Sequence, residues 1–272
     1  MSIFSSLVAQ SYIAYCENMP NHRGRHRIAK TLDKIFNSFE VEDSLGQKLE
    51  IYLSSSMDLS YFGKEGVKSH SPILKAVETL TEGDVFIDVG ANIGFFSLYA
   101  SRLIGESGRV LSFEPSQREF RRLLSNIESN KRSNILPYNL ALSDKVGDAY
   151  FSISRKSHTG INSLNKRTSR TDHTAIVPTC KGDLFINPFI EKADNCVIKV
   201  DVEGAEFLAL SGMSSCLKSK NISLVVVEIT PDFLSQFNHA KQDIYELMED
   251  CGFVPTMVSS HSEWQYDEVF VR

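Results

Sequence analysis

The chain has 272 residues, of which 42% are hydrophobic and 23% are charged. These fractions are close to the usual globular values and exclude wholesale disorder. Lys and Arg number 29 against 34 Asp and Glu, and the net charge of −5 argues against a globally basic nucleic-acid binder. The five cysteines lie far apart without zinc-ligand spacing, which favours reduced thiols in a cytoplasmic protein.

The sequence also lacks the usual signals of membrane insertion and export. No apolar run approaches the roughly 20 residues that cross a bilayer. The N-terminus carries no basic residue before its apolar stretch, and polar residues interrupt that stretch. We therefore expect neither a transmembrane segment nor a signal peptide.

The N-terminal 80 residues predict an extension of helices and short strands. Apolar residues keep helical spacing over residues 3–12 and 28–39. The basic cluster at 22–27 is predicted to be an exposed turn between these helices, or else a docking patch for an anionic substrate or partner. Residues 47–62 are typical of short strands, and Pro72 suits the first position of a further helix.

From residue 83 onward, short apolar runs alternate with amphipathic helices. Alternation of this length predicts an α/β fold with a doubly wound parallel sheet. The predicted strands are 85–89, 110–113, 135–142, 197–202, 224–229, 253–258 and 268–271. The predicted helices are 95–103, 116–130, 205–217 and 244–250. The second of these helices starts with Ser116 and Glu119, the spacing of a capping box.

One stretch, residues 150–178, interrupts the alternation. Residues 149–153 and 174–177 are predicted to pair as an inserted hairpin. The segment between them is basic, has no acidic residue from 155 to 171, and is rich in Ser, Thr and Asn. A functional lid and a simply disordered loop are equally compatible with this composition.

A glycine-rich turn after the first core strand is the strongest local signal. Residues 85–96 read as a buried strand that ends in Asp88 and turns through Gly90 and Gly94 into a helix. The glycines leave room for a ligand against the backbone, and the N–H groups of the helix start are expected to be free to bind it. The spacing is not the G-x-G-x-x-G of dinucleotide sites, and Asp88 would repel a pyrophosphate. Because a carboxylate tolerates a cationic ligand, the turn favours S-adenosylmethionine over NAD.

Acids at two further strand ends support a nucleoside-binding site. Glu114 follows the second core strand, where a carboxylate accepts hydrogen bonds from ribose hydroxyls. Asp201 and Glu203 follow a strand that contains Lys199, and Gly204 opens the next helix. Because a lysine buried among apolar residues needs an acid partner, these residues predict a polar site at the strand tip.

Four motifs, at residues 86–94, 112–115, 140–147 and 198–206, resemble those of the FkbM-type S-adenosylmethionine-dependent methyltransferases in order and spacing. The resemblance covers about residues 80 to 230. It implies a class I methyltransferase (Rossmann-like) sheet of seven strands in the order 3-2-1-4-5-7-6, with strand 7 antiparallel and formed by residues 268–271. Residues 81–272 would then form the methyltransferase domain, and residues 1–80 the extension.

The resemblance also implies roles for individual residues. Those expected around the methionine part of the cofactor are Asp88, Gly90, Ala91, Asn92 and Gly94. Glu114 is expected on the ribose, and Asp201 near the reacting methyl group. The backbone of Ala141 and Leu142 is expected beside the adenine, with Ser143 and Asp144 close behind.

The expected reaction is O-methylation of a hydroxyl on a sugar, a glycan or another small metabolite. Asp201 and Glu203 are the predicted base, oriented by Lys199, with His158 or His173 of the insertion as alternatives. We expect no metal, because no His-rich ligand set accompanies the acids. Three other functions stay open: an RNA methyltransferase that uses the basic stretches as phosphate contacts, a non-catalytic methyltransferase-like binding module, and an NAD dehydrogenase.

Overall fold

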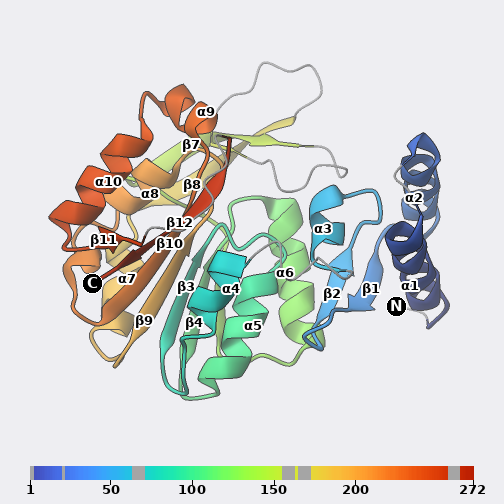
Figure 1. The fold of residues 1–272 in the computed structure, drawn as a ribbon, viewed down its shortest axis with the longest axis horizontal. Coiled ribbons are helices and arrows are strands. Elements are labelled where there is room, and N and C mark those ends of the chain that lie inside the picture. Colours follow the sequence, from blue (N-terminus) through green and yellow to red (C-terminus); the bar gives the residue numbers. More distant parts are fainter. Residues whose placement is uncertain (1–2, 20–21, 63–70, 155–162, 165–172, 257–263) are drawn as a thin grey trace.

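A computed structural model describes residues 3–19, 22–62, 71–154, 163–164, 173–256 and 264–272. Figure 1 shows a central sheet covered by helices on both faces, with the N-terminal helices at one end of the molecule. No helix in these ranges is long and apolar enough to cross a membrane.

The central sheet has seven strands in the order β11-β12-β10-β9-β3-β4-β5. Numbered along the chain as core strands, this is 6-7-5-4-1-2-3, and only β12 runs antiparallel to its neighbours. The predicted order and the predicted antiparallel last strand are both confirmed. The strands are β3 (Val85–Val89), β4 (Arg109–Phe113), β5 (Ile135–Tyr138), β9 (Cys196–Val200), β10 (Ile222–Ile229), β11 (Val254–Pro255) and β12 (Tyr266–Val271).

Helices cover both faces because the central strands are apolar on both. In β3, Val85, Ile87 and Val89 pack into one buried cluster, and Phe86 packs into the other. The first face is covered by α7 (Asp183–Ile190), α8 (Glu206–Ser211) and α10 (Lys241–Asp250); the second is covered by α4 (Ser71–Val77) and α5 (Phe95–Ile104), with α6 (Gln117–Ser129) beside them. Shorter turns are η3 (Cys216–Lys218), α9 (Pro231–Leu234) and η4 (Ser235–Phe237). The sequence analysis missed α7 and predicted one helix where α8 and η3 are separate.

A second, three-stranded sheet contains the inserted hairpin. Strands β7 (Gly147–Ile153) and β8 (His173–Cys180) pair antiparallel, and β6 (Ala141–Leu142) pairs with β8. The predicted hairpin is therefore confirmed, but the predicted strand 135–142 is divided between two sheets. The basic stretch 155–170 lies outside the described residues, apart from Ser163 and Leu164.

The N-terminal extension consists of α1 (Ile3–Asn18), α2 (Arg23–Phe36), β1 (Phe39–Glu42), β2 (Lys48–Ile51) and α3 (Ser56–Ser60). Three expectations were wrong here. Phe39 belongs to β1, which pairs with β2, and not to a helix. The second half of 47–62 is a helix because the Ser55 hydroxyl caps the N–H of Asp58. The basic cluster begins α2, where the His22 ring accepts the N–H of Gly24.

Buried polar contacts tie this extension to α6. The guanidinium of Arg122 is paired with the carboxylate of Asp58, and these side chains are 3% and 0% exposed. Arg122 also donates to the carbonyl of Glu50, and the Asn126 side chain accepts the N–H of the same residue at 2.7 Å. The α3 end of the extension is thereby fixed against the methyltransferase-like core. The boundary near residue 80 stays a prediction.

Candidate active site

Parallel register brings polar side chains of neighbouring strands together at the carboxyl edge of the sheet. Asp88 is in register with Ser112 on one side and with Lys199 on the other. Lys199 is in register with Val226, so Asp201 and Glu228, each two residues further on, lie side by side. The result is a polar row buried within the sheet and an acidic row at its edge.

Lys199 connects the two rows. Its Nζ lies 3.2 Å from Asp88 Oδ1 and 3.3 Å from Asp201 Oδ2, and it donates to the carbonyl of Gly90 at 3.1 Å. Burial alone would lower the pKa of Lys199, but the carboxylates of Asp201 and Asp88 outweigh that effect and raise its pKa. Lys199 thus has two acid partners, Asp88 and Asp201, where the sequence predicted at least one.

A cavity lies at this edge of the sheet. Nine of the predicted site residues line it: Gly90, Ala91, Asn92, Glu114, Ala141, Leu142, Lys199, Asp201 and Glu203. The wall also includes residues that the sequence analysis missed, among them Met57, Tyr61, Phe151, Glu228 and Gln265.

Four predicted site residues lie outside the cavity lining. The carboxylate of Asp88 is completely buried behind the wall, where Oδ2 accepts the Ser97 hydroxyl at 2.6 Å. Gly94 faces the side chain of Leu123 on α6. The Ser143 hydroxyl donates a hydrogen bond to Oδ1 of Asp144, and neither residue lines the cavity. The roles expected of these four residues at the cofactor stay predictions.

The glycine turn is shaped by protein contacts. A Cβ on Gly90 would lie 1.8 Å from the carbonyl oxygen of Asp201, so this glycine permits the close approach of the loop after β9. The N–H groups of Gly90 and Ala91 donate to the carbonyl of Phe113, and that of Asn92 donates to Glu114 Oε2. The N–H groups of the turn are therefore used within the protein, and the expectation of free N–H groups at the start of α5 stays a prediction.

Glu114 accepts the N–H of Asn92 at 2.9 Å and that of Ser116 at 2.8 Å. It is 5% exposed, and burial, followed by the charge of Glu119, raises the pKa of Glu114 to about 8. Because Ser116 N–H is taken by Glu114, the predicted capping box does not form; the Ser116 hydroxyl instead donates to the carboxylate of Glu119.

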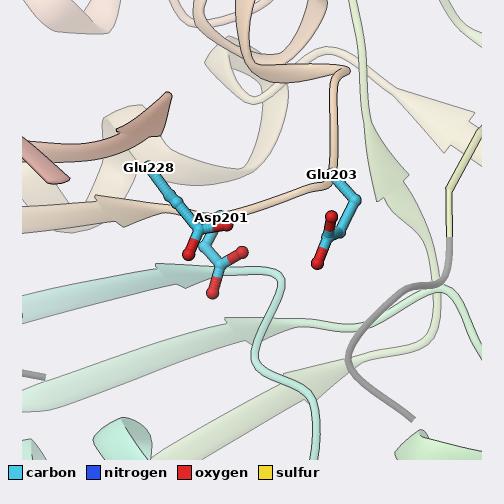
Figure 2. A group of neighbouring side chains, drawn as sticks. All are labelled: Asp201, Glu203 and Glu228. Carbon is cyan, nitrogen blue, oxygen red and sulfur yellow. The ribbon is translucent and has the colours of Figure 1, made fainter. Parts of the chain in front are cut away.

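Three carboxylates gather in the wall of the cavity. Oxygens of Asp201, Glu203 and Glu228 all lie within 4.8 Å of one another. Figure 2 shows Asp201 and Glu228 next to each other and Glu203 directed toward them from the loop after β9. Glu203 has a positive φ of 54°, and its carbonyl accepts the hydroxyl of Ser163 from the insertion. Of the alternative bases, His173 begins the exposed end of β8, and His158 is outside the described residues.

The polar groups of the cavity suit a ligand that donates hydrogen bonds. The Oδ1 atom of Asn92 is buried and has no hydrogen-bond partner in the described part of the chain. Together with Glu114 it would accept from hydroxyl or ammonium groups. Phe113, Leu140 and Leu142 provide an apolar surface against which a nucleobase such as adenine could pack. S-adenosylmethionine, with two ribose hydroxyls, an ammonium and a sulfonium, fits these residues.

Comparisons with known proteins agree with this assignment. Residues 88–255 match the methyltransferase FkbM domain. The hexuronic acid methyltransferase AglP of Haloferax volcanii is 33% identical over 153 residues, which are 56% of this chain and 59% of that relative. The methyltransferase sdnD of Sordaria araneosa is 24% identical over 81% of this chain and 91% of its own length.

Among solved structures, the methyltransferase FkbM of Methylobacillus flagellatus aligns with a TM-score of 0.45 at 14% identity, over 70% of this chain and 44% of that one. The family match extends from the end of β3 to β11, and so includes the strand ends that contribute to the cavity; Gln265, just before β12, lies outside it. The chain therefore belongs to the FkbM methyltransferase family and is an S-adenosylmethionine-dependent methyltransferase.

Proposed function

We propose that the protein methylates a hydroxyl of a sugar, a glycan or another small metabolite. The observation that carries this proposal is the carboxylate cluster of Asp201, Glu203 and Glu228 in the wall of the cavity. An alcohol acceptor loses a proton during methyl transfer, and carboxylates at that point would receive it. The similarity to a protein named as a hexuronic acid methyltransferase supports a sugar acceptor.

The cofactor supplies the methyl group as a sulfonium, whose positive charge the acidic end of the cavity accommodates. In this proposal Glu114 holds the ribose, and the wall at Ala141 and Leu142 holds the adenine. The turn from Gly90 to Asn92 holds the methionine part. Catalysis then depends mostly on position, since the acceptor oxygen must lie about 3 Å from the methyl carbon and in line with the departing sulfur.

Lys199 is part of the cavity wall, and Asp88 lies buried behind it. The ammonium of Lys199 fixes the carboxylate of Asp201 at 3.3 Å and the turn at Gly90 at 3.1 Å. Asp88 fixes Lys199 in turn. We therefore propose that Asp88 positions the methionine subsite through Lys199, without touching the ligand.

RNA methylation is the weaker alternative. One of its two basic stretches begins α2, and Figure 1 shows α2 at the end of the molecule, with β1 and β2 between it and α6. The other stretch lies outside the described residues. A non-catalytic module is disfavoured by the intact acceptors Glu114 and Asn92 in the cavity.

The test is methyl transfer from labelled S-adenosylmethionine to a panel of uronic acids, neutral sugars, glycans and an RNA control. We expect labelled ether products with a sugar and none with RNA. Calorimetry should show binding of S-adenosylmethionine and none of NAD. Transfer to RNA alone, or binding without transfer to any hydroxyl compound, would refute the proposal.

A further inference from the structure

Glu228 is the cavity acid to which the sequence pattern assigned no role. It lies on β10 one residue before the strand ends, and its carboxylate contributes to the cavity wall. Figure 2 shows this carboxylate next to that of Asp201, and oxygens of these two carboxylates and of Glu203 lie within 4.8 Å of one another. Three acids therefore compete for the proton that an acceptor hydroxyl releases.

The positive charge in this region is unevenly shared. The Nζ atom of Lys199 lies 3.3 Å from Asp201 and 3.2 Å from Asp88, on the β3 side of the cluster. Asp201 is therefore the acid of the cluster whose charge is already paired with an ammonium, and this pairing suits it to hold its place beside the sulfonium.

Charged residues of several elements surround Glu228. Asp201 lies beside it after β9, Glu203 follows in the next loop, and Asp267 is its direct partner in register on β12. The ammonium of Lys199 on β9 also interacts with the charge of Glu228. The helices α8 and α4 pack on β10 as well; Glu206 of α8 is buried, and Lys75 of α4 is exposed.

These surroundings increase the proton affinity of Glu228. Burial raises the pKa of Glu228 well above its ordinary value, and the charges of Asp201 and Glu203 raise it further. Carboxylates with a raised pKa are the stronger bases once ionised, and catalytic efficiency improves as the pKa approaches the working pH. Geometry and charge therefore distinguish Glu228 from Asp201.

We propose that Glu228 is the general base of the methyl transfer proposed above, on which this inference rests. As the acceptor oxygen bonds to the methyl carbon, the carbon–sulfur bond breaks and its electron pair stays on sulfur, which becomes a neutral thioether. The hydroxyl proton moves to the carboxylate of Glu228 and leaves later to water through the open cavity. Asp201 stays paired with Lys199 throughout.

The same cluster would also suit a divalent cation, but Lys199 makes that use less favourable. Its ammonium already places a positive charge 3.3 Å from the central carboxylate of Asp201, and two cations at that separation repel. A general base that acts without a metal ion is consistent with the position of Lys199, whose ammonium pairs with Asp201 and Asp88.

The first test is Glu228→Gln, which preserves the size of the side chain but cannot take a proton. We expect the cofactor Kd to stay within about twofold while kcat falls by about 100-fold or more. Glu228→Asp, which keeps the carboxylate, should recover part of the loss. Wild-type kcat in Glu228→Gln, or activity abolished by EDTA and restored by Mg²⁺, would overturn the proposal.

The pH profile separates a base from a merely structural residue. For the wild type, kcat/KM should rise with pH as Glu228 ionises, and this acidic limb should be absent from Glu228→Gln. Asp267→Asn removes the charge opposite Glu228. As a single substitution it should move the acidic limb of kcat/KM to lower pH, and combined with Glu228→Gln it should have no such effect. An identical limb in the wild type and Glu228→Gln would overturn the proposal.

A third measurement does not require the acceptor to be known. The carboxyl carbon of Glu228 can be followed by NMR in the cofactor-bound protein, with its signal identified by its loss in Glu228→Gln. We expect it to titrate well above the ordinary glutamate range of about 4 to 5. Titration in the ordinary range refutes the role of Glu228 even if sugars are methylated. A raised value without sugar methylation refutes only the proposed function.

Discussion

Glu114 shows how burial prepares a residue for its ligand. Its pKa of about 8 means that the carboxyl group is mostly protonated at pH 7. Ribose hydroxyls donate to the ionised form, so cofactor binding should lower this pKa. We predict that cofactor binding at pH 7 releases about one proton. The cofactor should therefore bind more tightly as the pH rises from 6 to 8. Calorimetry in two buffers with different ionisation enthalpies measures both.

The control for this prediction is Glu114→Gln, which keeps a hydrogen-bond acceptor but cannot ionise. It should bind the cofactor more weakly and should lose the proton release that belongs to this residue. If the variant releases as many protons as the wild type, the ribose is held by another group.

Lys199 is the residue on which the buried charges depend. Lys199→Met leaves the carboxylate of Asp88, which is 0% exposed, without its cation. Removing one partner of a buried ion pair costs about 3–5 kcal/mol, and we expect a loss of that size in the free energy of unfolding by urea. Asp201 should contribute less to this loss, because its side chain is 18% exposed and can be rehydrated.

The double variant Lys199→Met/Asp88→Asn identifies the cause. Without a charge on residue 88 most of the stability should return, so the two substitutions should be strongly non-additive. Additive losses would show that Lys199 stabilises the protein through packing alone. Because the double variant also lacks the anchor of Asp201, its methyl transfer should stay impaired after its stability has recovered.

At the level of single residues, the sequence located the site better than it located the contacts. A strand end followed by an acid or a glycine identified Glu114, Asp201 and Gly90, because parallel strands deliver such residues to one edge. Glu228 was missed although it sits near the end of a predicted strand. The implied strand order made β9 and β10 neighbours but did not give their register, and only that register places Glu228 beside Asp201.

At the level of elements, the meeting of two turns determines the shape of the cavity. Gly90→Ala would place a Cβ 1.8 Å from the carbonyl oxygen of Asp201 and force the β3–α5 turn away from the loop after β9. We predict a clear loss of cofactor affinity together with a loss of stability, measured by calorimetry and urea unfolding.

Gly46→Ala is the matched control. Gly46 has φ of 75°, close to the 83° of Gly90, but a Cβ there meets nothing within 4 Å. It should cost only the backbone penalty of about 1–2 kcal/mol and leave cofactor binding unchanged. If both substitutions have equal effects, a glycine is required at residue 90 because of its positive φ, and not because the carbonyl of Asp201 approaches it closely.

The elements that the sequence predicted are those whose apolar pattern is undisturbed by tertiary contacts. The buried strands β3, β4 and β9 are short apolar runs, and so their positions were predicted within one or two residues. The α3 helix was missed because its start depends on the Ser55 cap and its stability on the buried pair of Asp58 with Arg122. Such contacts join residues far apart in the chain and leave no local periodicity.

At the level of the whole molecule, the extension forms part of the cavity wall. Met57 of α3 and Tyr61 at its end line the cavity, and Tyr61 stacks on Phe95 of α5 with ring centroids 4.4 Å apart. Burial, followed by the charge of Asp201, raises the pKa of Tyr61 far above its ordinary value, so its hydroxyl stays neutral. The extension thus contributes a neutral, largely apolar wall to a cavity whose other side is acidic.

This arrangement makes the pair of Asp58 and Arg122 a link between stability and cofactor binding. Asp58→Asn leaves the guanidinium of Arg122, which is 3% exposed, without its counter-charge. It should cost about 3–5 kcal/mol of stability. Since Met57 and Tyr61 flank residue 58, we also expect the cofactor Kd to rise by about tenfold, or 1.4 kcal/mol. The exposed Asp148→Asn, on β7, should change neither quantity. A destabilised Asp58→Asn protein with wild-type Kd would show that α3 stabilises the fold without shaping the cavity.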